Sequence, residues 1–316
     1  MNILEIKNLN LSFRSNDKEY QALHNVNLSL KKGEMLAIVG ESGCGKTITA
    51  MSILRLLAPN AKITSGAIIY NGENILSLPE KDLQYIRGKE IALVPQDPMT
   101  SLNPLYTIGS QLLEVIETHQ KVYGSEAEQI AIEVLNQVKI PNAKERLNAY
   151  PHEFSGGMRQ RVIIAMAIAC KSKIIIADEP TTALDVTVQA QIMELLKDIQ
   201  KEMGTSFIFI SHDFGVVYEA ADSVAVMYGG HVVENSSSKE LFQNPKHPYT
   251  KALLKTLPDF NSTKLEAIEG QPPSIKDTFA GCSFEPRCSS CMAICKTKNP
   301  DCINVNNACV SCWLYK

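Results

Sequence analysis

The spacing of hydrophobic positions changes along the chain and predicts where the strands lie. Residues 2–30 alternate apolar and polar side chains, as half-buried strands do. Three shorter segments, 35–39, 173–177 and 206–210, are almost continuously apolar, which is typical of strands buried on both faces. We therefore expect a sheet whose central strands are covered on both sides.

Helical periodicity separates these strands. An amphipathic helix is predicted at 188–199, and the turn-rich segment 97–160 contains further helices at 111–117 and 126–138. Alternating strands and helices favour an α/β fold, with 97–160 as a helical insertion. After residue 235 the pattern loosens, and Asn235-Ser236-Ser237-Ser238 is interpreted as a break. The prediction is a domain over 1–235 followed by a C-terminal extension over 236–316.

Composition narrows the class of protein. A chain of 316 residues holds one large domain and a smaller appendage. A net charge of −3 argues against a nucleic-acid coat protein, which needs a basic surface. No apolar run reaches the roughly 18–20 residues that span a bilayer, and no signal peptide is visible. We expect a cytosolic protein that reaches a membrane only through a partner.

A phosphate-binding sequence follows the first buried strand. Its residues are Gly40-Glu41-Ser42-Gly43-Cys44-Gly45-Lys46-Thr47, which is a complete G-x-x-x-x-G-K-[ST] pattern. Glycines allow backbone N–H groups to converge on a phosphate at a helix N-terminus. Lys46 is expected to bridge the β- and γ-phosphates, and Thr47 to bind Mg²⁺. The predicted nucleotide contacts here are Gly40, Ser42, Gly43, Cys44, Gly45, Lys46, Thr47 and Ile48.

Two carboxylates, Asp178 and Glu179, end the apolar run 173–177. Open α/β sheets bind ligands at the carboxyl ends of their strands. Asp178 is expected to hold Mg²⁺ through water, and Glu179 to act as general base toward the attacking water. An isolated Asp-Glu pair is more often a salt-bridged strand end, but the phosphate loop upstream favours the catalytic interpretation.

A Ser-Gly-Gly sequence, Ser155-Gly156-Gly157, opens a predicted helix that runs to Ala169. Such a terminus exposes N–H groups to an anion, although Ser155 could also simply cap the helix. Residues 154–161 resemble the signature of ATP-binding cassette (ABC) ATPases. The resemblance implies a P-loop NTPase cassette, with a RecA-like core and a helical subdomain at about 97–160. It also implies that Ser155, Gly156 and Gly157 close the γ-phosphate bound by an opposing cassette.

Four further residues match the same family. Gln96 matches the Q-loop glutamine, which binds Mg²⁺ and contacts the transmembrane partner. Asp185 matches the D-loop, although Thr182 stands where serine is usual. His212 matches the switch histidine at the γ-phosphate. Phe13 matches an aromatic residue stacked on adenine, with a core phenylalanine as the alternative.

Segments 96–104, 150–153 and 244–254 resemble the oligopeptide/dipeptide importer subfamily, which includes nickel importers. The resemblance implies an ATP-hydrolysing importer subunit on the cytoplasmic face of the plasma membrane. Its partners would be a second ABC ATPase, commonly a paralogue, two transmembrane permease subunits and an extracytoplasmic substrate-binding protein, with no nucleic acid. A nickel or metal-chelate importer ATPase and a non-transport cytosolic ABC ATPase are the alternatives.

Seven of the nine cysteines lie in the last 35 residues. In a reducing compartment, metal or iron–sulfur ligation is favoured over a disulfide framework. The spacing of Cys282, Cys288 and Cys295, followed by Cys312, resembles the [4Fe–4S] motif of the subfamily. Zinc is the alternative because Cys288 and Cys291 form a C-x₂-C pair. Cys309 is the alternative to Cys312, and Cys291, Cys302 and Cys309 fall outside the pattern.

Overall fold

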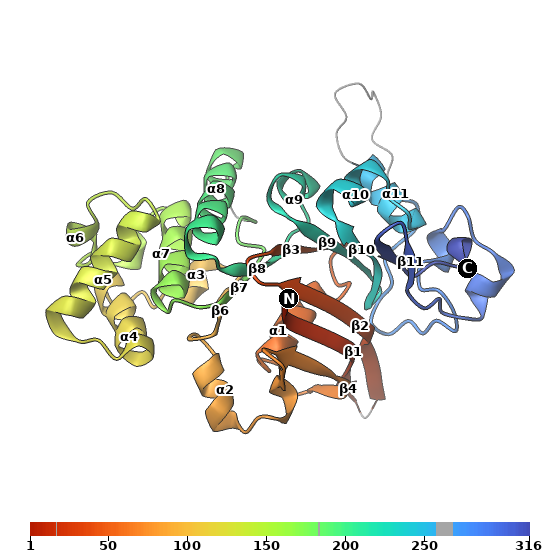
Figure 1. Cartoon of the computed structure of the whole chain (residues 1–316), viewed down its shortest axis with the longest axis horizontal. Coiled ribbons are helices and arrows are strands. Elements are labelled where there is room, and N and C mark those ends of the chain that lie inside the picture. Colours follow the sequence, from red (N-terminus) through yellow and green to blue (C-terminus); the bar gives the residue numbers. More distant parts are fainter. Residues whose placement is uncertain (17, 183, 257–267) are drawn as a thin grey trace. The chain divides into compact units, whose positions relative to one another are not determined.

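The computed structural model describes residues 1–16, 18–182, 184–256 and 268–316. The chain divides into two compact units (Figure 1). One contains Met1–Ser77 and Ile210–Lys316, and the other contains Leu78–Phe209. Each unit combines strands with helices, so the predicted α/β class is confirmed.

The first unit contains an antiparallel sheet in the order β2-β1-β4-β5. The alternation predicted over residues 2–30 is observed around the ladder centre, where Leu9, Leu11, Leu23 and Val26 are fully buried while Asn10 and Asn25 are not. Leu11 lies opposite Leu23 and Leu9 opposite Val26 in the ladder. The strands are β1 (Asn2–Ser15), β2 (Lys18–Lys31), β4 (Ala61–Tyr70) and β5 (Glu73–Asn74).

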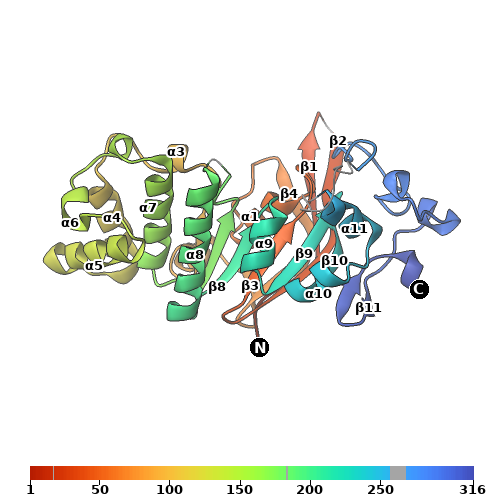
Figure 2. The ribbon, with the colours of Figure 1, turned by 90° about the horizontal axis from the view of Figure 1, so that it is seen from above.

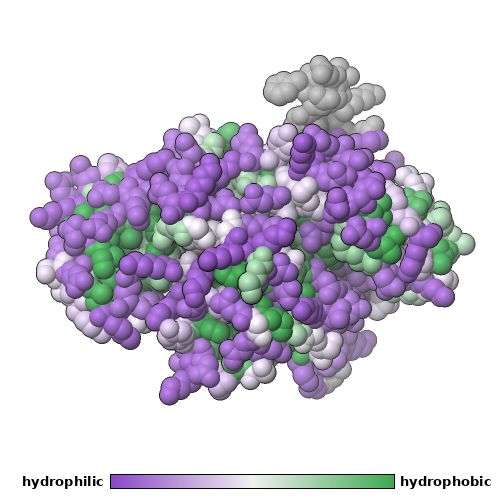
Figure 3. Space-filling view, in the orientation of Figure 1, coloured by the Kyte–Doolittle hydropathy of each residue, from purple (hydrophilic) through white to green (hydrophobic). Residues whose placement is uncertain are grey.

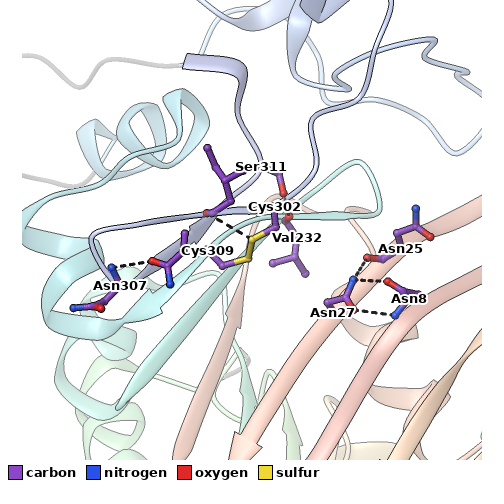
Figure 4. Close-up of a disulfide and its surroundings, with 10 residues drawn as sticks. Asn8, Asn25, Asn27, Val232, Cys302, Asn307, Cys309 and Ser311 are labelled. Atoms are coloured by element: carbon purple, nitrogen blue, oxygen red, sulfur yellow. Dashed lines mark hydrogen bonds between the residues drawn. A yellow bond between two sulfur atoms is a disulfide. The ribbon is translucent and has the colours of Figure 1, made fainter. Parts of the chain in front are cut away.

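A small asparagine network lies on the exposed side of this sheet (Figure 4). The Asn27 amide donates to Asn8 at 3.2 Å and to the Asn25 carbonyl at 2.7 Å. The Asn10 amide donates to the Asn25 side chain at 2.9 Å. Asn8 and Asn25 adopt positive φ angles of 48° and 47° near irregularities in the ladder. Asparagine tolerates this conformation better than most residues, so these positions are explained by local backbone geometry.

The second sheet of this unit has the order β11-β12-β10-β9-β3. Every residue of β3 is at most 1% exposed, as its uninterrupted apolar sequence predicts. Helix α9 lies above this sheet and α1 lies below it (Figures 1 and 2). The strands are β3 (Met35–Val39), β9 (Ser223–Tyr228), β10 (His231–Ser237), β11 (Ile303–Val305) and β12 (Ala308–Val310). The helices are α1 (Lys46–Ile53), α9 (Phe214–Ala220), α10 (Ser238–Gln243) and α11 (Pro248–Lys255).

The break predicted at 235–238 is wrong. Asn235, Ser236 and Ser237 continue β10 and pair with Ala225, Val224 and Ser223 of β9. Ser237 then caps α10 by accepting a hydrogen bond from the Glu240 N–H at 3.3 Å. Ladder bonds use backbone groups alone, so a polar segment can continue a strand. Serine at its end provides the cap for the next helix.

The second unit contains strands in the order β8-β7-β6, with β6 and β7 parallel. Helices predicted from periodicity are present but longer than the apolar pattern indicates, because capping residues define their ends. Thr107 caps α4, and Lys121 ends it in a left-handed conformation. The strands are β6 (Ile91–Val94), β7 (Ile174–Asp178) and β8 (Ser206–Ile210, which ends at the unit boundary). The helices are α2 (Glu80–Ile86), α3 (Pro98–Ser101), α4 (Ile108–Gln120), α5 (Gly124–Gln137), α6 (Ala143–Arg146), α7 (Gly156–Ala169) and α8 (Val186–Met203).

No helix in the described ranges is long and apolar enough to cross a membrane. The face of the molecule in Figure 3 is mostly hydrophilic, with hydrophobic residues scattered among polar ones.

Candidate functional site

The predicted phosphate loop connects β3 to α1 in the first unit. Gly45 stands immediately before α1 with a φ of 107°, a conformation that L side chains rarely adopt. A Cβ on Gly40 would collide with the carbonyl oxygen of Met227, and one on Gly45 would lie 2.8 Å from Leu23. Glycine is therefore required at both positions to bring the loop close to the neighbouring strands.

Lys46 is turned back over this loop. Its Nζ donates to the carbonyl oxygens of Gly40, at 2.9 Å, and Glu41, at 3.0 Å, and the residue is only 6% exposed. Ser42, Gly43 and Thr47 are exposed, and Ile48 is half-buried. The Cys44 thiol is buried, and burial raises its pKa above the ordinary value. The exposed side of the loop therefore carries backbone groups and hydroxyls, which suits a phosphate ligand.

His212 and Phe13 also belong to the first unit. The N–H of Ser211 donates to Ile38 of β3 at 3.3 Å, so the exposed His212 lies close to the end of the strand that leads into the phosphate loop. Phe13 is half-buried on β1, opposite Tyr20 of β2 and Ala61 of β4.

The second unit brings Gln96, Asp178 and Glu179 to one edge of its sheet. Gln96 follows β6, and the two carboxylates end and follow the parallel neighbour β7. Asp178 is 2% exposed. One oxygen of Glu179, Oε2, accepts hydrogen bonds from the Gln96 amide at 3.0 Å and from the Thr182 hydroxyl at 2.8 Å. The carboxylate is thus oriented by two neutral donors.

The backbone of Glu179 is unusual as well. Its φ of 45° lies in the left-handed region, which a glutamate adopts at an energetic cost. Strained residues of this kind are concentrated at functional sites. The conformation therefore favours a functional interpretation of Glu179 over that of an ordinary strand end.

The Ser-Gly-Gly sequence begins α7, as predicted. Ser155 does cap this helix, accepting from the Met158 N–H at 3.3 Å, and Asp185 caps α8 by accepting from the Val188 N–H at 3.0 Å. A Cβ on Gly157 would lie 2.5 Å from Val188, whereas one on Gly156 would have ordinary contact with its surroundings. Gly157 thus lets the first turn of α7 pack against the first turn of α8.

Thr182 and Glu41 were not predicted to be site residues. The threonine was noted only as a departure from the usual serine, yet either residue supplies the hydroxyl that bonds Glu179. Glu41 occupies a variable position of the phosphate-loop pattern. Its side chain pairs with Arg287, 246 residues later, so no local pattern could indicate the contact.

The four predicted cluster cysteines line one cavity. Cys282, Cys288, Cys295 and Cys312 surround it together with apolar and aromatic neighbours that include Phe284. The Cys282 N–H donates to the Cys295 carbonyl at 2.8 Å, which ties two of the segments together. Burial raises the pKa of the Cys282 thiol to about 11. Exposed Cys291 is not among the cavity-lining residues.

No group of three or more His, Cys, Asp or Glu side chains is placed to hold a metal ion in the described parts of the chain. Whether a metal group fits the cavity is therefore judged from the chemistry of the four cysteine thiols that line it. Four thiols around one partly apolar space match the four thiolates that an iron–sulfur cluster requires.

Metal ligation was favoured over a disulfide framework for the tail cysteines, and one pair outside the four predicted ligands departs from it. Cys302 and Cys309 are disulfide-bonded, with their Cα atoms 5.6 Å apart (Figure 4). The hairpin of β11 and β12 brings the two residues together, since Asn304 and Cys309 are directly opposite each other. This pairing leaves Cys312, rather than Cys309, at the cavity.

Comparison with known proteins gives two family matches along the chain. Residues 23–182 match the ABC transporter family, and residues 233–295 match the oligopeptide/dipeptide transporter C-terminal region. The first match includes the phosphate loop, the Ser-Gly-Gly helix and the carboxylate pair. The second includes α10, α11 and three of the four cavity cysteines.

Curated relatives match over nearly the whole chain. The oligopeptide transport ATP-binding protein OppD of Bacillus subtilis is 48% identical, over 99% of this chain and 88% of its own length. The dipeptide transport ATP-binding protein DppD of the same organism is 47% identical, over 99% and 94%.

Solved structures agree on the fold. The dimeric structure of MJ0796, described as a bacterial ABC transporter cassette, is 30% identical with a TM-score of 0.67, and it covers 74% of this chain and 98% of that one. A dimeric post-hydrolysis state of MJ0796 bound to ADP and phosphate has a TM-score of 0.66, with 30% identity and the same coverage. The predicted P-loop ATPase cassette is thereby confirmed. The chain belongs to the ABC transporter family of ATP-hydrolysing cassettes, within the group that carries the oligopeptide/dipeptide transporter C-terminal region.

Proposed function

We propose that this chain is the ATPase subunit that drives the import of oligopeptides or dipeptides. The observation that carries the proposal is the combination of a complete nucleotide-binding sequence with full-length similarity to peptide-transport ATP-binding proteins, C-terminal region included. The similarity extends through the extension, which favours peptide import over a non-transport ATPase. A nickel importer of the same subfamily is the second candidate.

Roles in ATP hydrolysis are proposed for the phosphate-loop residues and for the residues around Glu179. Residues 40–48 hold the phosphates, with Lys46 moving from the loop carbonyls to the β- and γ-phosphates. Glu179 orients the attacking water and accepts its proton, while Gln96 and Thr182 fix the direction of its carboxylate. His212 contacts the γ-phosphate, Asp185 lies at the interface with the second cassette, and Phe13 stacks on adenine.

Magnesium is the ion proposed for the nucleotide site, because the residues predicted to bind it offer oxygen donors. Thr47 and Gln96 supply neutral oxygens, and Asp178 supplies a buried carboxylate that binds the ion through water. When bound, Mg²⁺ neutralises charge that develops on the phosphates.

A second cassette is proposed as the partner that completes the site. The N-terminus of α7 carries Ser155, Gly156 and Gly157, and a helix N-terminus of this kind suits a γ-phosphate from outside the chain. The related cassette MJ0796 is described as dimeric. We propose that the partner here is a paralogous ATPase, as the subfamily resemblance implies.

A docking surface for the permease is proposed around α3 and the start of α7. Met99, Leu105, Tyr106 and Tyr150 expose between 40% and 80% of their surface. They lie close together, since Arg159 bonds both the Met99 sulfur and the Pro151 carbonyl, and the Ile108 N–H donates to Ala149. Such a patch favours contact with a permease segment, which would hold the chain at the cytoplasmic face of the membrane. A substrate-binding protein would deliver the peptide on the other side.

Transport by the purified complex tests the proposed cargo. The whole complex, in vesicles with ATP on the side of this subunit, is expected to accumulate labelled di- or oligopeptide. Replacing Lys46 by Ala should abolish the uptake. ATP-dependent accumulation of Ni²⁺ without any peptide uptake would establish the nickel importer instead.

The cysteine cavity is proposed to hold a [4Fe–4S] cluster on Cys282, Cys288, Cys295 and Cys312. A zinc ion needs its thiolates to converge about 2.3 Å from one point. A [4Fe–4S] cluster is larger than a single ion and occupies the space between its four cysteine ligands. The proposal is supported by the four cysteines that line one cavity, since four thiolates are the ligands of such a cluster.

Anaerobic purification tests the cluster. The protein should be brown and contain about four irons per chain. Replacing Cys288 or Cys295 by Ser should bleach it, whereas Cys302→Ser should not, because Cys302 bonds Cys309. About one zinc per chain without iron would replace the cluster by a structural zinc site.

A further inference from the structure

Glu41, the second residue of the phosphate loop, forms an ion pair with the C-terminal extension. The Arg287 guanidinium contacts both oxygens of its carboxylate, at 2.6 Å and 3.0 Å. Only 5% of the Arg287 side chain and 23% of the Glu41 side chain are exposed. A two-point pair of this kind, shielded from water, fixes the orientation of both groups.

The backbone of Glu41 is held by the same extension. Its N–H donates to the hydroxyl of Tyr249 at 3.0 Å, and Tyr249, on α11, is fully buried. Arg287 also donates to the Tyr228 hydroxyl at 3.2 Å. Residues from two separate segments of the extension therefore hold both the side chain and the main chain of one phosphate-loop residue.

Glu41, which Arg287 and Tyr249 hold, also contacts Lys46, the lysine predicted to bind phosphate. The carbonyl oxygen of Glu41 accepts from Lys46 Nζ at 3.0 Å and from the Cys44 N–H at 3.3 Å. A rotation of the Glu41 peptide would thus move the groups that prepare the loop for phosphate. Binding sites of this kind lose affinity when their donors are no longer pre-organised.

The same extension residues adjoin the cysteine cavity. Arg287 directly precedes Cys288, and both lie in or next to the short 3₁₀ turn Glu285–Arg287. Phe284, in the cavity wall, packs against Tyr249 and Tyr228, with ring centroids 5.3 Å and 5.1 Å apart. The position of the clamp on Glu41 thus depends on the segment that holds the first two cysteines.

We propose that Arg287 and Tyr249 are positioning residues for the phosphate loop, and that a metal group at the four cysteines holds them in place. ATP affinity then depends on the state of the cysteine site. This inference rests on the proposed nucleotide and cluster sites. It adds a link between them that runs through Glu41.

The clamp is tested by the equilibrium binding of a non-hydrolysable ATP analogue. Arg287→Gln should raise the Kd about tenfold, and Arg287→Lys, which keeps the charge but not the two-point geometry, should have a smaller effect. Tyr249→Phe, which removes one acceptor, should raise the Kd about threefold. KM for ATP should rise while kcat at saturating ATP stays close to that of the unmodified protein.

Two further variants show whether the effect runs through Glu41. Lys239→Gln removes an exposed cation on α10 of the same extension, and it should leave ATP binding unchanged. Glu41→Gln combined with Arg287→Gln should bind ATP no worse than Arg287→Gln alone. Unchanged affinity in a folded Arg287→Gln protein, or losses that simply add in the double variant, would overturn the clamp.

The link to the cysteine site has its own readout. Cys288→Ser should lose bound iron and weaken ATP binding, and it should add no further loss in an Arg287→Gln background. Loss of the metal with unchanged ATP affinity would overturn the link. Absence of any metal from the anaerobic unmodified protein would overturn both the cluster and the link, while the Arg287→Gln result would still decide the clamp.

Discussion

Glu179 combines a strained backbone with a carboxylate that two side chains orient. Gln96 and Thr182 both donate to Oε2. A general base needs a fixed direction toward the water that it activates, because misalignment by a fraction of a bond length lowers the rate steeply. The two observed hydrogen bonds provide such a direction for the Glu179 carboxylate.

Replacement of Glu179 by Gln should therefore separate binding from hydrolysis. The variant keeps the size and hydrogen bonds of the side chain but is not a base, so ATP binding should persist while hydrolysis slows by about 10²–10⁴. Phosphate release under saturating ATP measures the effect. Glu202→Gln, on the exposed end of α8, is the matched control. Hydrolysis by Glu179→Gln at the unmodified rate would show that another group is the base.

Thr182 gives a finer test of the same geometry. Thr182→Ala removes one of the two donors to Glu179 and should slow hydrolysis about tenfold, with ATP affinity unchanged. Thr182→Ser restores the hydroxyl and should restore the rate. Equal rates for the alanine and serine variants would mean that the hydrogen bond has no part in orienting the base.

Among the helices, α7 and α8 can pack closely because residue 157 is a glycine and has no side chain. Gly157→Ala would place a methyl group 2.5 Å from Val188, whereas Gly156→Ala would meet no atom closer than 3.6 Å. We expect Gly157→Ala to destabilise the fold by about 1–3 kcal/mol, as overpacking does. Gly156→Ala, one residue away in the same sequence motif, should leave stability unchanged. Thermal unfolding of the two variants decides, and equal stabilities would contradict the predicted clash.

His231, at the start of β10, makes this unit sensitive to acid. It stacks on His24, with ring centroids 4.5 Å apart, and burial lowers the pKa of His231 to about 3. Between the unfolded pKa of about 6.5 and that value, only the unfolded chain binds the proton, so stability falls as pH falls. Because the side chain is only partly buried, we expect a loss of about 1–2 kcal/mol from pH 7.5 to pH 5.

Denaturant unfolding at the two pH values measures this loss. His231→Gln keeps a polar side chain without the titration, so its stability should fall less than that of the unmodified protein over the same interval. An identical fall in both proteins would assign the acid sensitivity to other groups.

Local patterns predict the central elements of this fold but not the contacts that join distant segments. The runs at 35–39 and 206–210 became β3 and β8 because apolar strands buried on both faces leave an unambiguous signal. The polar run at 235–238 led to the wrong prediction of a break, since the hydrogen bonds between strands do not depend on side-chain polarity. The contact of Arg287 with Glu41 carries no periodic signal, and the disulfide partners are set by the hairpin that brings them together.

For the whole molecule, the predicted nucleotide residues are distributed over both units and along most of the chain. The phosphate loop and His212 belong to one unit, whereas Gln96, Glu179 and the Ser-Gly-Gly helix belong to the other. The N-terminus of α7 is capped by Ser155, which accepts a hydrogen bond from the Met158 N–H. The completion of the reaction site by a second cassette is a proposal, and it rests on the Ser-Gly-Gly sequence at the start of α7 and on the dimeric description of the related cassette MJ0796.

The mass in solution of the Glu179→Gln protein tests that central claim most directly. It should be measured alone and with each candidate second cassette, with and without ATP, since the proposed shared site would keep two cassettes together while ATP is bound and not hydrolysed. We expect an ATP-dependent complex with one copy of each cassette, which Ser155→Arg in this chain should prevent. An unchanged mass on adding ATP with every partner, a second copy of this chain included, would contradict it.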